Sequence, residues 1–446
     1  MKRTNDIALN LEEAQSVSSV SAVYEALRAA LFSPEWVKRF RLSETAFSRR
    51  RDLPFAPLVT WLLNLRKGSL EQELEGFFAT LEGQPYASAP PTPSALCQAR
   101  QRLSAPIFPA LNRLAIATWR GRQGPALWHG FRLLAVDGST LRLPRYPGLE
   151  GHFGVQARGP LLARASMLYD LSQELILDFQ LGAYCISERE LAIAHLHAAE
   201  AGDLILYDRG YPAFWLMAMH RQQGREFCMR LPGASFAAAE PFWTREATSE
   251  IITLTATSEQ RRECRQQGLS TDPIRLRLVR VPLQGGETEV LATTVLEEER
   301  LPARLFKALY HRRWGAEESY KRQKRWVEIK NLSGRSVLSV QQDVQAKILA
   351  LNLSSLVRSV AQLITTRRYQ QRRHHYQVRW TSTLSTMKNT FVRLLLSGAH
   401  APITLLTTLV VKLSAAVEAV RPDRQFPRHN PGKLKPRFHA PYRRTA

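Results

Sequence analysis

The segment from Phe131 to about residue 225 constrains the fold most, because it alternates short strand-like runs with helical ones. Three apolar, β-rich runs come first, in FRLLAVDGSTLRL, ARASMLYDLS and ELILDFQLGAY. A helical pattern follows in ERELAIAHLHAAEA, then a buried strand in LILYDRG and a helix in AFWLMAMHRQQ. Three consecutive strands, a helix, a strand and a further helix predict an α/β core with one mixed sheet.

The sequence on either side of this core has a different pattern of apolar and polar residues. The N-terminal part has apolar residues at helical spacing, the block after the core is strand-like with Gly and polar turns, and the chain after Leu301 is again mostly helical to Val420. The Pro- and Arg-rich end predicts a flexible tail. The expected segments are a helical N-terminal region, the first part of the core, a β-rich insertion, the completion of the core and a basic helical C-terminal region with its tail, at residues 1–125, 126–225, 226–300, 301–365 and 366–446.

The charge of the chain indicates a polyanionic partner. Lys and Arg number 62 against 39 Asp and Glu, which gives a formal net charge of +23. Such an excess repels itself in the free protein and is favourable beside nucleic acid. A basic protein of another kind, such as a ribosome-associated factor, would show the same balance. With 44% hydrophobic residues the chain can bury a large core and is not expected to be disordered.

Cysteine usage and hydropathy favour a cytoplasmic protein without a membrane span. The four cysteines include no CxxC pair, so neither a zinc ribbon nor a disulfide framework is indicated. The first residues, MKRTNDIALNLEE, are acidic where a signal peptide needs an apolar run. The most apolar late stretch, Ile403 to Val411, is too short to cross a bilayer.

A Pro-rich break at residues 87–94 separates two helical stretches of the N-terminal region. Ser94 is expected to cap the basic helix ALCQARQRL that follows the break. This helix carries Arg100 and Arg102 after a tight turn, as the reading helix of a helix-turn-helix would. A solvated helix face explains the same residues, and both interpretations stay open.

Two aspartates occur where apolar strands end. Asp137 follows the strand in LLAVDGS and Asp208 follows the strand in LILYDRGY. A carboxylate at a strand end is held by the sheet but faces solvent, as a metal ligand must. Each aspartate alone is explained as a turn residue, and for Asp137 the turn is the better interpretation. Two of them on strands of one sheet favour a divalent-metal site.

The segment LYHRRWGAEESYKRQKRWVEIK places four reactive side chains at regular spacing. Arg313, Glu317 and Lys324 follow Tyr310 by 3, 7 and 14 residues. On one continuous helix these four positions fall within roughly 60° of one another. A carboxylate flanked by two cations and a phenol is suited to clamping a phosphate beside a metal ligand. A salt-bridged surface helix is the alternative, and Gly315 lowers the local helix propensity.

These residues resemble the insertion-sequence-4 family of DDE transposases. The pattern Tyr-x2-Arg-x3-Glu-x6-Lys matches that family's signature at every position, after a first aspartate in VDGST and a second in YDRGY. The resemblance covers about residues 90–360 and preserves the order of the motifs. It implies an RNase H-like catalytic core in a bacterial, nucleoid-associated cytoplasmic protein. The regions outside this range match only in broad character.

The resemblance implies catalysis by Asp137, Asp208 and Glu317 with two Mg²⁺ or Mn²⁺ ions about 4 Å apart. Asp137 would bridge the ions while Asp208 and Glu317 each hold one. Water would cut the transposon end, and the freed 3′-hydroxyl would attack target DNA, in a cut-and-paste reaction with a hairpin intermediate. Contacts to the DNA would come from Tyr310, Arg313 and Lys324. The expected partners are terminal inverted repeats and target DNA, bound by a homodimer.

Three further features have a functional and a structural interpretation each. Arg209, beside Asp208, suits a phosphate contact or plain surface charge. Trp243 in the insertion suits a displaced base, although a core tryptophan is the better interpretation. The basic run at residues 365–380 mixes Arg with aromatic residues and suits backbone contact and stacking, or a solvated linker.

Rival functions remain open at this point. A nuclease on the same scaffold would share the carboxylates but would not require the cations and phenol around Glu317. A domesticated DNA-binding regulator derived from a transposase would not need the carboxylates for its activity. An RNA-binding protein would account for the net charge alone.

Overall fold

The computed structural model describes residues 8–48, 53–156, 159–233, 236–283, 287–397 and 402–421. It divides into two compact units. The first, called the helical unit, contains residues 1–124, 142–162 and 322–446, and the second, called the sheet unit, contains residues 125–141 and 163–321. The predicted flexible tail from residue 422 lies outside the described residues.

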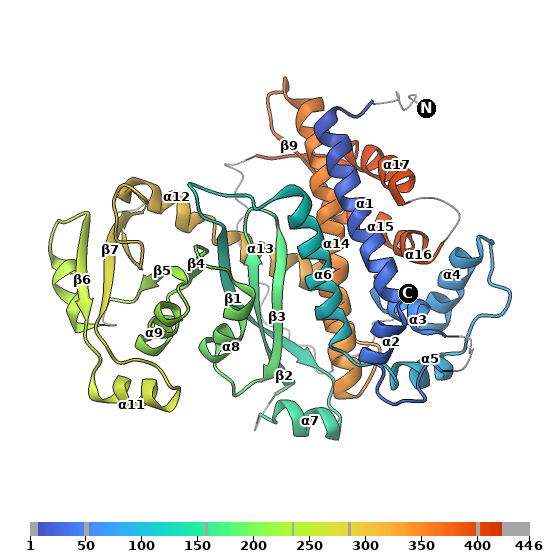
Figure 1. Cartoon of the computed structure of the whole chain (residues 1–446), viewed down its shortest axis with the longest axis horizontal. Coiled ribbons are helices and arrows are strands. Elements are labelled where there is room, and N and C mark those ends of the chain that lie inside the picture. Colours follow the sequence, from blue (N-terminus) through green and yellow to red (C-terminus); the bar gives the residue numbers. More distant parts are fainter. Residues whose placement is uncertain are drawn as a thin grey trace. The chain divides into compact units, whose positions relative to one another are not determined.

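The helical unit is organised around α14 (Val337–Tyr369), a buried helix of 33 residues. The helices α1 (Leu11–Phe32), α6 (Ile107–Gln123) and α17 (Pro402–Ser414) pack along it (Figure 1). The other elements are α2 (Pro34–Phe40), α3 (Phe55–Leu63), α4 (Leu70–Glu82), α5 (Pro93–Arg100), α7 (Pro147–Phe153), α15 (Trp380–Met387), α16 (Thr390–Leu395), β9 (Tyr376–Val378) and β10 (Val417–Ala419).

Within the described part of the chain, α14 is the one helix long and apolar enough to cross a membrane. Of its most apolar stretch, 83% is buried. Burial of this kind is what the central helix of a helical core shows, since its apolar residues contact other helices on every side.

The sheet unit contains most of one eight-stranded sheet. Its strands are β1 (Leu133–Leu143), β2 (Leu161–Asp170), β3 (Leu175–Ala183), β4 (Leu204–Tyr207), β5 (Glu226–Leu231), β6 (Ser249–Leu254), β7 (Ile274–Pro282) and β8 (Thr288–Thr293). Its helices are α8 (Glu188–His195), α9 (Phe214–Gln222), α10 (Glu240–Thr244), α11 (Ser258–Gln266), α12 (Phe306–His311) and the first residues of α13 (Trp314–Arg325). Short 3-10 turns lie at Leu196–Ala198, Ala237–Ala239 and Ala303–Leu305.

The strand order is β3-β2-β1-β4-β5-β8-β7-β6. The pairs β1–β4 and β4–β5 are parallel, whereas β2–β3 and the pairs among β5, β8, β7 and β6 are antiparallel. The central strands β1 and β4 begin with wholly buried runs, because parallel strands are covered on both faces. This mixed sheet, with its first five strands in the order 3-2-1-4-5, confirms the predicted α/β, RNase H-like class.

The strands of the expected β-rich insertion continue the catalytic sheet. β5 pairs in parallel with β4, so the first strand of residues 226–300 is part of the core. The strands β8, β7 and β6 then extend the same sheet outward from β5. The chain from residue 322 groups with the N-terminal helices, although the core was expected to continue to residue 365. The five-segment division therefore stays a prediction.

The start of α5 differs from the sequence prediction. Thr92 is the N-cap, and its hydroxyl accepts a hydrogen bond from the backbone N–H of Ala95. Pro93 occupies the first helical position, which suits a proline because its missing N–H has no partner there in any helix. The prediction of Ser94 as the cap was therefore wrong by two residues.

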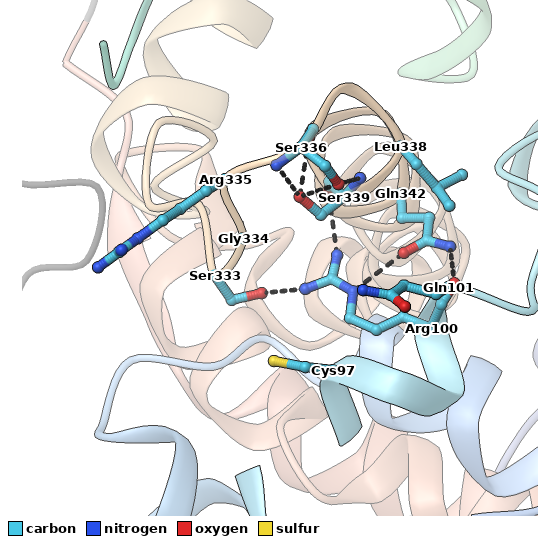
Figure 2. A pocket seen from close by; sticks show the side chains of 10 residues that line it. All are labelled: Cys97, Arg100, Gln101, Ser333, Gly334, Arg335, Ser336, Leu338, Ser339 and Gln342. Atoms are coloured by element: carbon cyan, nitrogen blue, oxygen red, sulfur yellow. Dashed lines mark hydrogen bonds between the residues drawn. The ribbon is translucent and has the colours of Figure 1, made fainter. Parts of the chain in front are cut away.

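Arg100 is buried, and both interpretations of it were wrong. Its side chain donates hydrogen bonds to Gln342 and Ser333 at 3.0 and 2.7 Å (Figure 2). It also donates to Asp343 at 3.0 Å. A guanidinium that is 4% exposed and fully engaged inside the helical unit neither reads DNA nor lies on a solvated face. Its cavity, about 310 Å³, is lined by polar side chains that already bond one another, including Ser336 and Ser339.

Three buried cations surround Asp343 in the helical unit. Arg66 and Arg100 bond its carboxylate at 2.9 and 3.0 Å, and Lys347 lies one helical turn further along α14. Lys347 also donates to the backbone carbonyls of Glu328 and Asn331. Burial lowers the pKa of Lys347 to about 7, although Asp343 opposes this shift.

We expect the stability of the helical unit to rise with pH above neutrality. Between the lowered pKa of Lys347 and its ordinary value of 10.5, the unfolded chain binds a proton that the folded chain does not. Stability then increases with pH by up to about 1.4 kcal/mol per pH unit. Urea unfolding between pH 7.5 and 9.5 measures this slope, and Lys347→Met should flatten it. Equal slopes for the variant and the wild type would refute the assignment.

Candidate active site

Asp137 lies within β1, immediately after its wholly buried first four residues. The side chain is half-buried, and its Oδ1 accepts a hydrogen bond from the N–H of Gly138 at 3.0 Å. The hydroxyl of Tyr320 donates to the backbone carbonyl of Asp137 at 3.1 Å. The strand and the tyrosine therefore fix the backbone that carries this carboxylate.

Asp208 is the first residue after β4 and sits in a tight turn. Its Oδ1 accepts from the N–H of Gly210 at 2.8 Å, and its carbonyl accepts from the N–H of Tyr211 at 3.3 Å. In the parallel pair β1–β4, Ala135 is opposite Leu206. Asp137 and Asp208 each lie two residues beyond this pair, so both aspartates are at the same edge of the sheet.

Glu317 lies in the first turn of α13, but the predicted single helix is broken. Tyr310 is in α12, and a 3-10 turn joins α12 to α13, with N–H donors bonding carbonyls three residues back at Arg313 and Ala316. The stripe of four residues on one continuous helix was therefore wrong. The change in winding still leaves Arg313 beside Glu317, with Nη2 2.9 Å from Oε1.

Glu317 and Asp208 lie within electrostatic reach of Asp137. Burial raises the pKa of Asp137, Arg313 lowers it, and the charges of Glu317 and Asp208 raise it, so that together these effects raise the pKa to about 7. Hard carboxylate oxygens that repel one another in a partly buried site are suited to a divalent cation. Among the described residues no three acidic, His or Cys side chains are grouped closely enough to hold an ion, so binding requires these side chains to draw together.

The other predicted residues have different surroundings. Tyr310 is 7% exposed, and its hydroxyl donates to the carbonyl of Tyr207 at 3.3 Å, next to Asp208. Arg313 is 8% exposed and Arg209 is exposed. Lys324 is half-buried, in the part of α13 that belongs to the helical unit.

The structure also clarifies two alternatives. Trp243 is half-buried, and its neighbour Phe242 takes the core position, so the core interpretation fits Phe242 better. In the basic run, Trp380 is 5% exposed and lies under the guanidinium of Arg358 at 4.8 Å. Trp380 is therefore a packing residue and does not offer a face for stacking on a base. Arg367, in the same run, bonds Glu13 at 2.7 Å.

A second group of polar side chains in the sheet unit resembles a catalytic site, but it is buried and a substrate cannot reach it. His195 is within 2.8 Å of both Asp178 and Ser166, in the order of a hydrolytic Ser-His-Asp set. Both Ser166 and His195 are completely buried. The network therefore joins α8 to β2 and β3, and its role is structural.

Two residues of the site were missed by sequence reasoning. Tyr211 belongs to the YDRGY motif, and Glu188 begins α8. Both lie near the aspartates, because the charges of Glu188, Asp137 and Asp208 all raise the pKa of Tyr211, after burial. The YDRGY motif was a usable signal for Tyr211, whereas no local signal distinguishes Glu188 from an ordinary residue in the first turn of a helix.

The comparisons with known proteins concern the same region. The family described as transposase DDE domain matches residues 128–353. The transposase InsG of insertion sequence element IS4 from Escherichia coli K12 is 26% identical over 348 residues, which cover 74% of this chain and 77% of InsG. InsZ of the same organism is 26% identical over 215 residues, 46% of this chain and 71% of InsZ. A cryo-EM structure of a piggyBac transposase synaptic complex with hairpin DNA aligns with a TM-score of 0.43 and 10% identity, covering 87% and 81% of the two chains.

Proposed function

Because the chain belongs to the family of the transposase DDE domain and is a transposase, we propose that Asp137, Asp208 and Glu317 form its catalytic site for DNA cleavage and strand transfer. The enzyme acts on DNA and depends on a divalent metal ion, as its family implies. The observation that carries the assignment is that Asp137 and Asp208 lie at one edge of the sheet, and that Glu317 and Asp208 are close enough to Asp137 to raise its pKa.

The three carboxylates would hold two Mg²⁺ or Mn²⁺ ions. Asp137 is the bridging residue in this proposal, since both other carboxylates act on it, while Asp208 and Glu317 hold one ion each. Bound there, the ions would stabilise the negative charge on the attacking and leaving oxygens of the phosphodiester. The ion pair with Arg313 fixes the position of the Glu317 carboxylate, which would hold its ion from the first turn of α13.

The proposed reaction repeats one kind of displacement at phosphorus. Water first attacks the phosphodiester at the transposon end, and the 3′-oxygen leaves as a 3′-hydroxyl. This 3′-hydroxyl attacks the opposite strand to give a hairpin, and the 3′-hydroxyl of the flanking DNA leaves. Water then opens the hairpin and frees the 3′-hydroxyl of the transposon end, which attacks a phosphodiester of the target. Each step forms one P–O bond and breaks another, so no energy-rich cofactor is needed. Because both strands are cut at the transposon end, the proposed pathway is cut-and-paste.

Basic side chains of the motifs that carry the carboxylates would bind the DNA backbone. Arg313 suits a bidentate phosphate contact, and Lys324 a point-charge contact. Arg209 is exposed beside Asp208 and would contact a backbone phosphate. Tyr310 would act on DNA only after releasing the carbonyl of Tyr207, so its first role is to brace the turn that carries Asp208.

The partners in this proposal are terminal inverted repeats and target DNA, held by a homodimer that pairs two ends. The protein would work in the bacterial cytoplasm at the nucleoid. Its net charge of +23 supports binding to long DNA, because such an excess is neutralised by the phosphates.

A strand-transfer assay tests this function against a plain nuclease. The purified chain is mixed with labelled transposon-end DNA, a supercoiled target plasmid and Mg²⁺. Joined products with labelled ends are expected, with hairpin ends as intermediates on denaturing gels. Cleaved ends without any joined product would instead assign the protein as a nuclease. Binding of DNA with no Mg²⁺-dependent product would assign it as a regulator.

A further inference from the structure

Glu188 lies directly against the part of β1 that carries Asp137. A Cβ atom on Gly138 would lie 2.5 Å from the carboxyl carbon of Glu188 and under 3 Å from both of its oxygens. No side chain larger than glycine fits at this position without moving Glu188. The residue beside Asp137 thus leaves room for a further carboxylate, which is half-buried at the site.

The first turn of α8 holds Glu188 firmly in place. Arg164 donates to Glu188 at 2.9 Å, and Arg189 donates to the carbonyl of Gly210, in the turn of Asp208, at 2.8 Å. At the other end of the helix, the buried His195 network ties α8 to β2 and β3. This short helix therefore contacts both the strand segment that carries Asp137 and the turn that carries Asp208.

Tyr211 lies within electrostatic reach of the same carboxylates. The residue is 1% exposed, and its hydroxyl has no hydrogen-bond partner within the described ranges. Burial raises the pKa of Tyr211 well above its ordinary value, and the charges of Glu188, Asp137 and Asp208 raise it further. The hydroxyl therefore keeps its proton and is a buried donor without an acceptor, within electrostatic reach of several carboxylates.

A buried donor of this kind is unfavourable unless a bound molecule supplies the acceptor. Tyr24 in the helical unit is a useful contrast, because its buried hydroxyl also has no partner in the described structure. Burial alone raises the pKa of Tyr24, whereas carboxylates contribute at Tyr211. An oxygen held among those carboxylates would satisfy Tyr211 but not Tyr24.

We propose that Tyr211 and Glu188 bind the hydration water of the divalent cation held by Asp137, Asp208 and Glu317, with Tyr211 as hydrogen-bond donor and Glu188 as acceptor. Water on a cation has a lone pair for a hydroxyl and protons for a carboxylate, so the two side chains are complementary to it. They act as positioning residues for the cation and its water. This inference rests on the proposed function, because it requires the cation site.

Binding of Mn²⁺ to the full chain without DNA tests the inference. The free ion is followed by electron paramagnetic resonance, and the melting temperature of each variant is measured in parallel. Tyr211→Phe and Glu188→Gln should each raise the dissociation constant of Mn²⁺ about tenfold, the lower end of the effect of such contacts. Gly138→Ala should do the same, because it displaces Glu188 without removing its charge.

Two control variants match these changes. Tyr24→Phe removes another buried tyrosine hydroxyl without a partner in the described structure, and Glu190→Ala removes the side chain that caps the same helix at Ser187. Both should leave the dissociation constant within twofold of the wild type. Tyr211→Phe should not lower the melting temperature, since it removes a polar group that lacks a partner. A dissociation constant within twofold of the wild type for Tyr211→Phe or Glu188→Gln overturns the role of that residue.

Asp208→Asn separates this inference from the proposed function. Loss of Mn²⁺ binding in Asp208→Asn with wild-type binding in Tyr211→Phe and Glu188→Gln would overturn the inference alone. Wild-type binding in Asp208→Asn would overturn the metal site itself. Loss of Mn²⁺ binding in Asp208→Asn, together with a tenfold higher dissociation constant in Tyr211→Phe and Glu188→Gln, would support both the metal site and the inference.

Discussion

Asp208→Asn and Glu317→Gln are each expected to lower the rate of transposon-end cleavage at least about a thousandfold. The amides keep the size of the side chains but lose the charge that holds a divalent cation. A cation contributes several kcal/mol to stabilising the transition state, and each 1.36 kcal/mol corresponds to tenfold in rate. Single-turnover cleavage of labelled end DNA with Mg²⁺ measures the effect, and strand transfer should fall in parallel because both steps use one site.

Glu318→Gln is the matched control for Glu317→Gln. Glu318 is the next residue of α13, but its side chain is half exposed and pairs with Lys321 on the surface. Surface ion pairs of this kind contribute little to stability, and the variant should cleave at close to the wild-type rate. Equal rates for Glu317→Gln and Glu318→Gln would remove Glu317 from the catalytic site.

Asp137→Asn separates loss of catalysis from loss of folding. Burial and neighbouring carboxylates raise the pKa of Asp137, so its charge is unfavourable in the folded protein at neutral pH. Removing that charge should leave the melting temperature unchanged or higher while activity is lost. A variant that lost activity and also unfolded at a lower temperature would contradict this account of the site.

The fold was predictable where a local pattern decides the structure. The apolar runs that end at Asp137 and Asp208 can only be buried strands, and their order fixed an α/β sheet before any contact was known. The position of both aspartates at one sheet edge followed from this, because β1 and β4 are parallel neighbours. The break between Tyr310 and Glu317 was not predictable from the motif. The order and spacing of its residues in the sequence are the same whether the helix is continuous or interrupted by a 3-10 turn.

Long-range packing decided the features that the sequence did not reveal. Arg100 resembles a surface cation in its own helix, and it is buried because Asp343, 243 residues later, lies against it. Glu188 and Gly138 are 50 residues apart in the sequence, and only the structure shows that the Glu188 carboxyl group lies against Gly138. Tyr211 belongs to a motif, but its partnerless hydroxyl depends on what surrounds it. Local patterns thus located the carboxylates, and tertiary contacts defined their surroundings.

Asp343→Ala is expected to destabilise the helical unit by about 3–5 kcal/mol, the effect of removing one partner from a buried ion pair. Asp343 is completely buried, and its loss leaves Arg66, Arg100 and Lys347 facing one another without a counter-charge. These cations now hold the pKa of Asp343 below its usual range, which shows how strongly the folded state favours its charge. Removal of this carboxylate also leaves the N–H of Ser333 without its acceptor.

Urea unfolding measured by tryptophan fluorescence can test this, because Trp61 stacks on the guanidinium of Arg66 at 4.1 Å and reports on the cluster. Glu150→Ala is the control, since it breaks the exposed pair with Arg145 in the same unit and should change stability by less than about 1 kcal/mol. Asp343→Asn should destabilise nearly as much as alanine, because an amide restores hydrogen bonds but not charge. A loss below about 1 kcal/mol in Asp343→Ala would mean that the three cations tolerate one another, and that water reaches them in the folded protein.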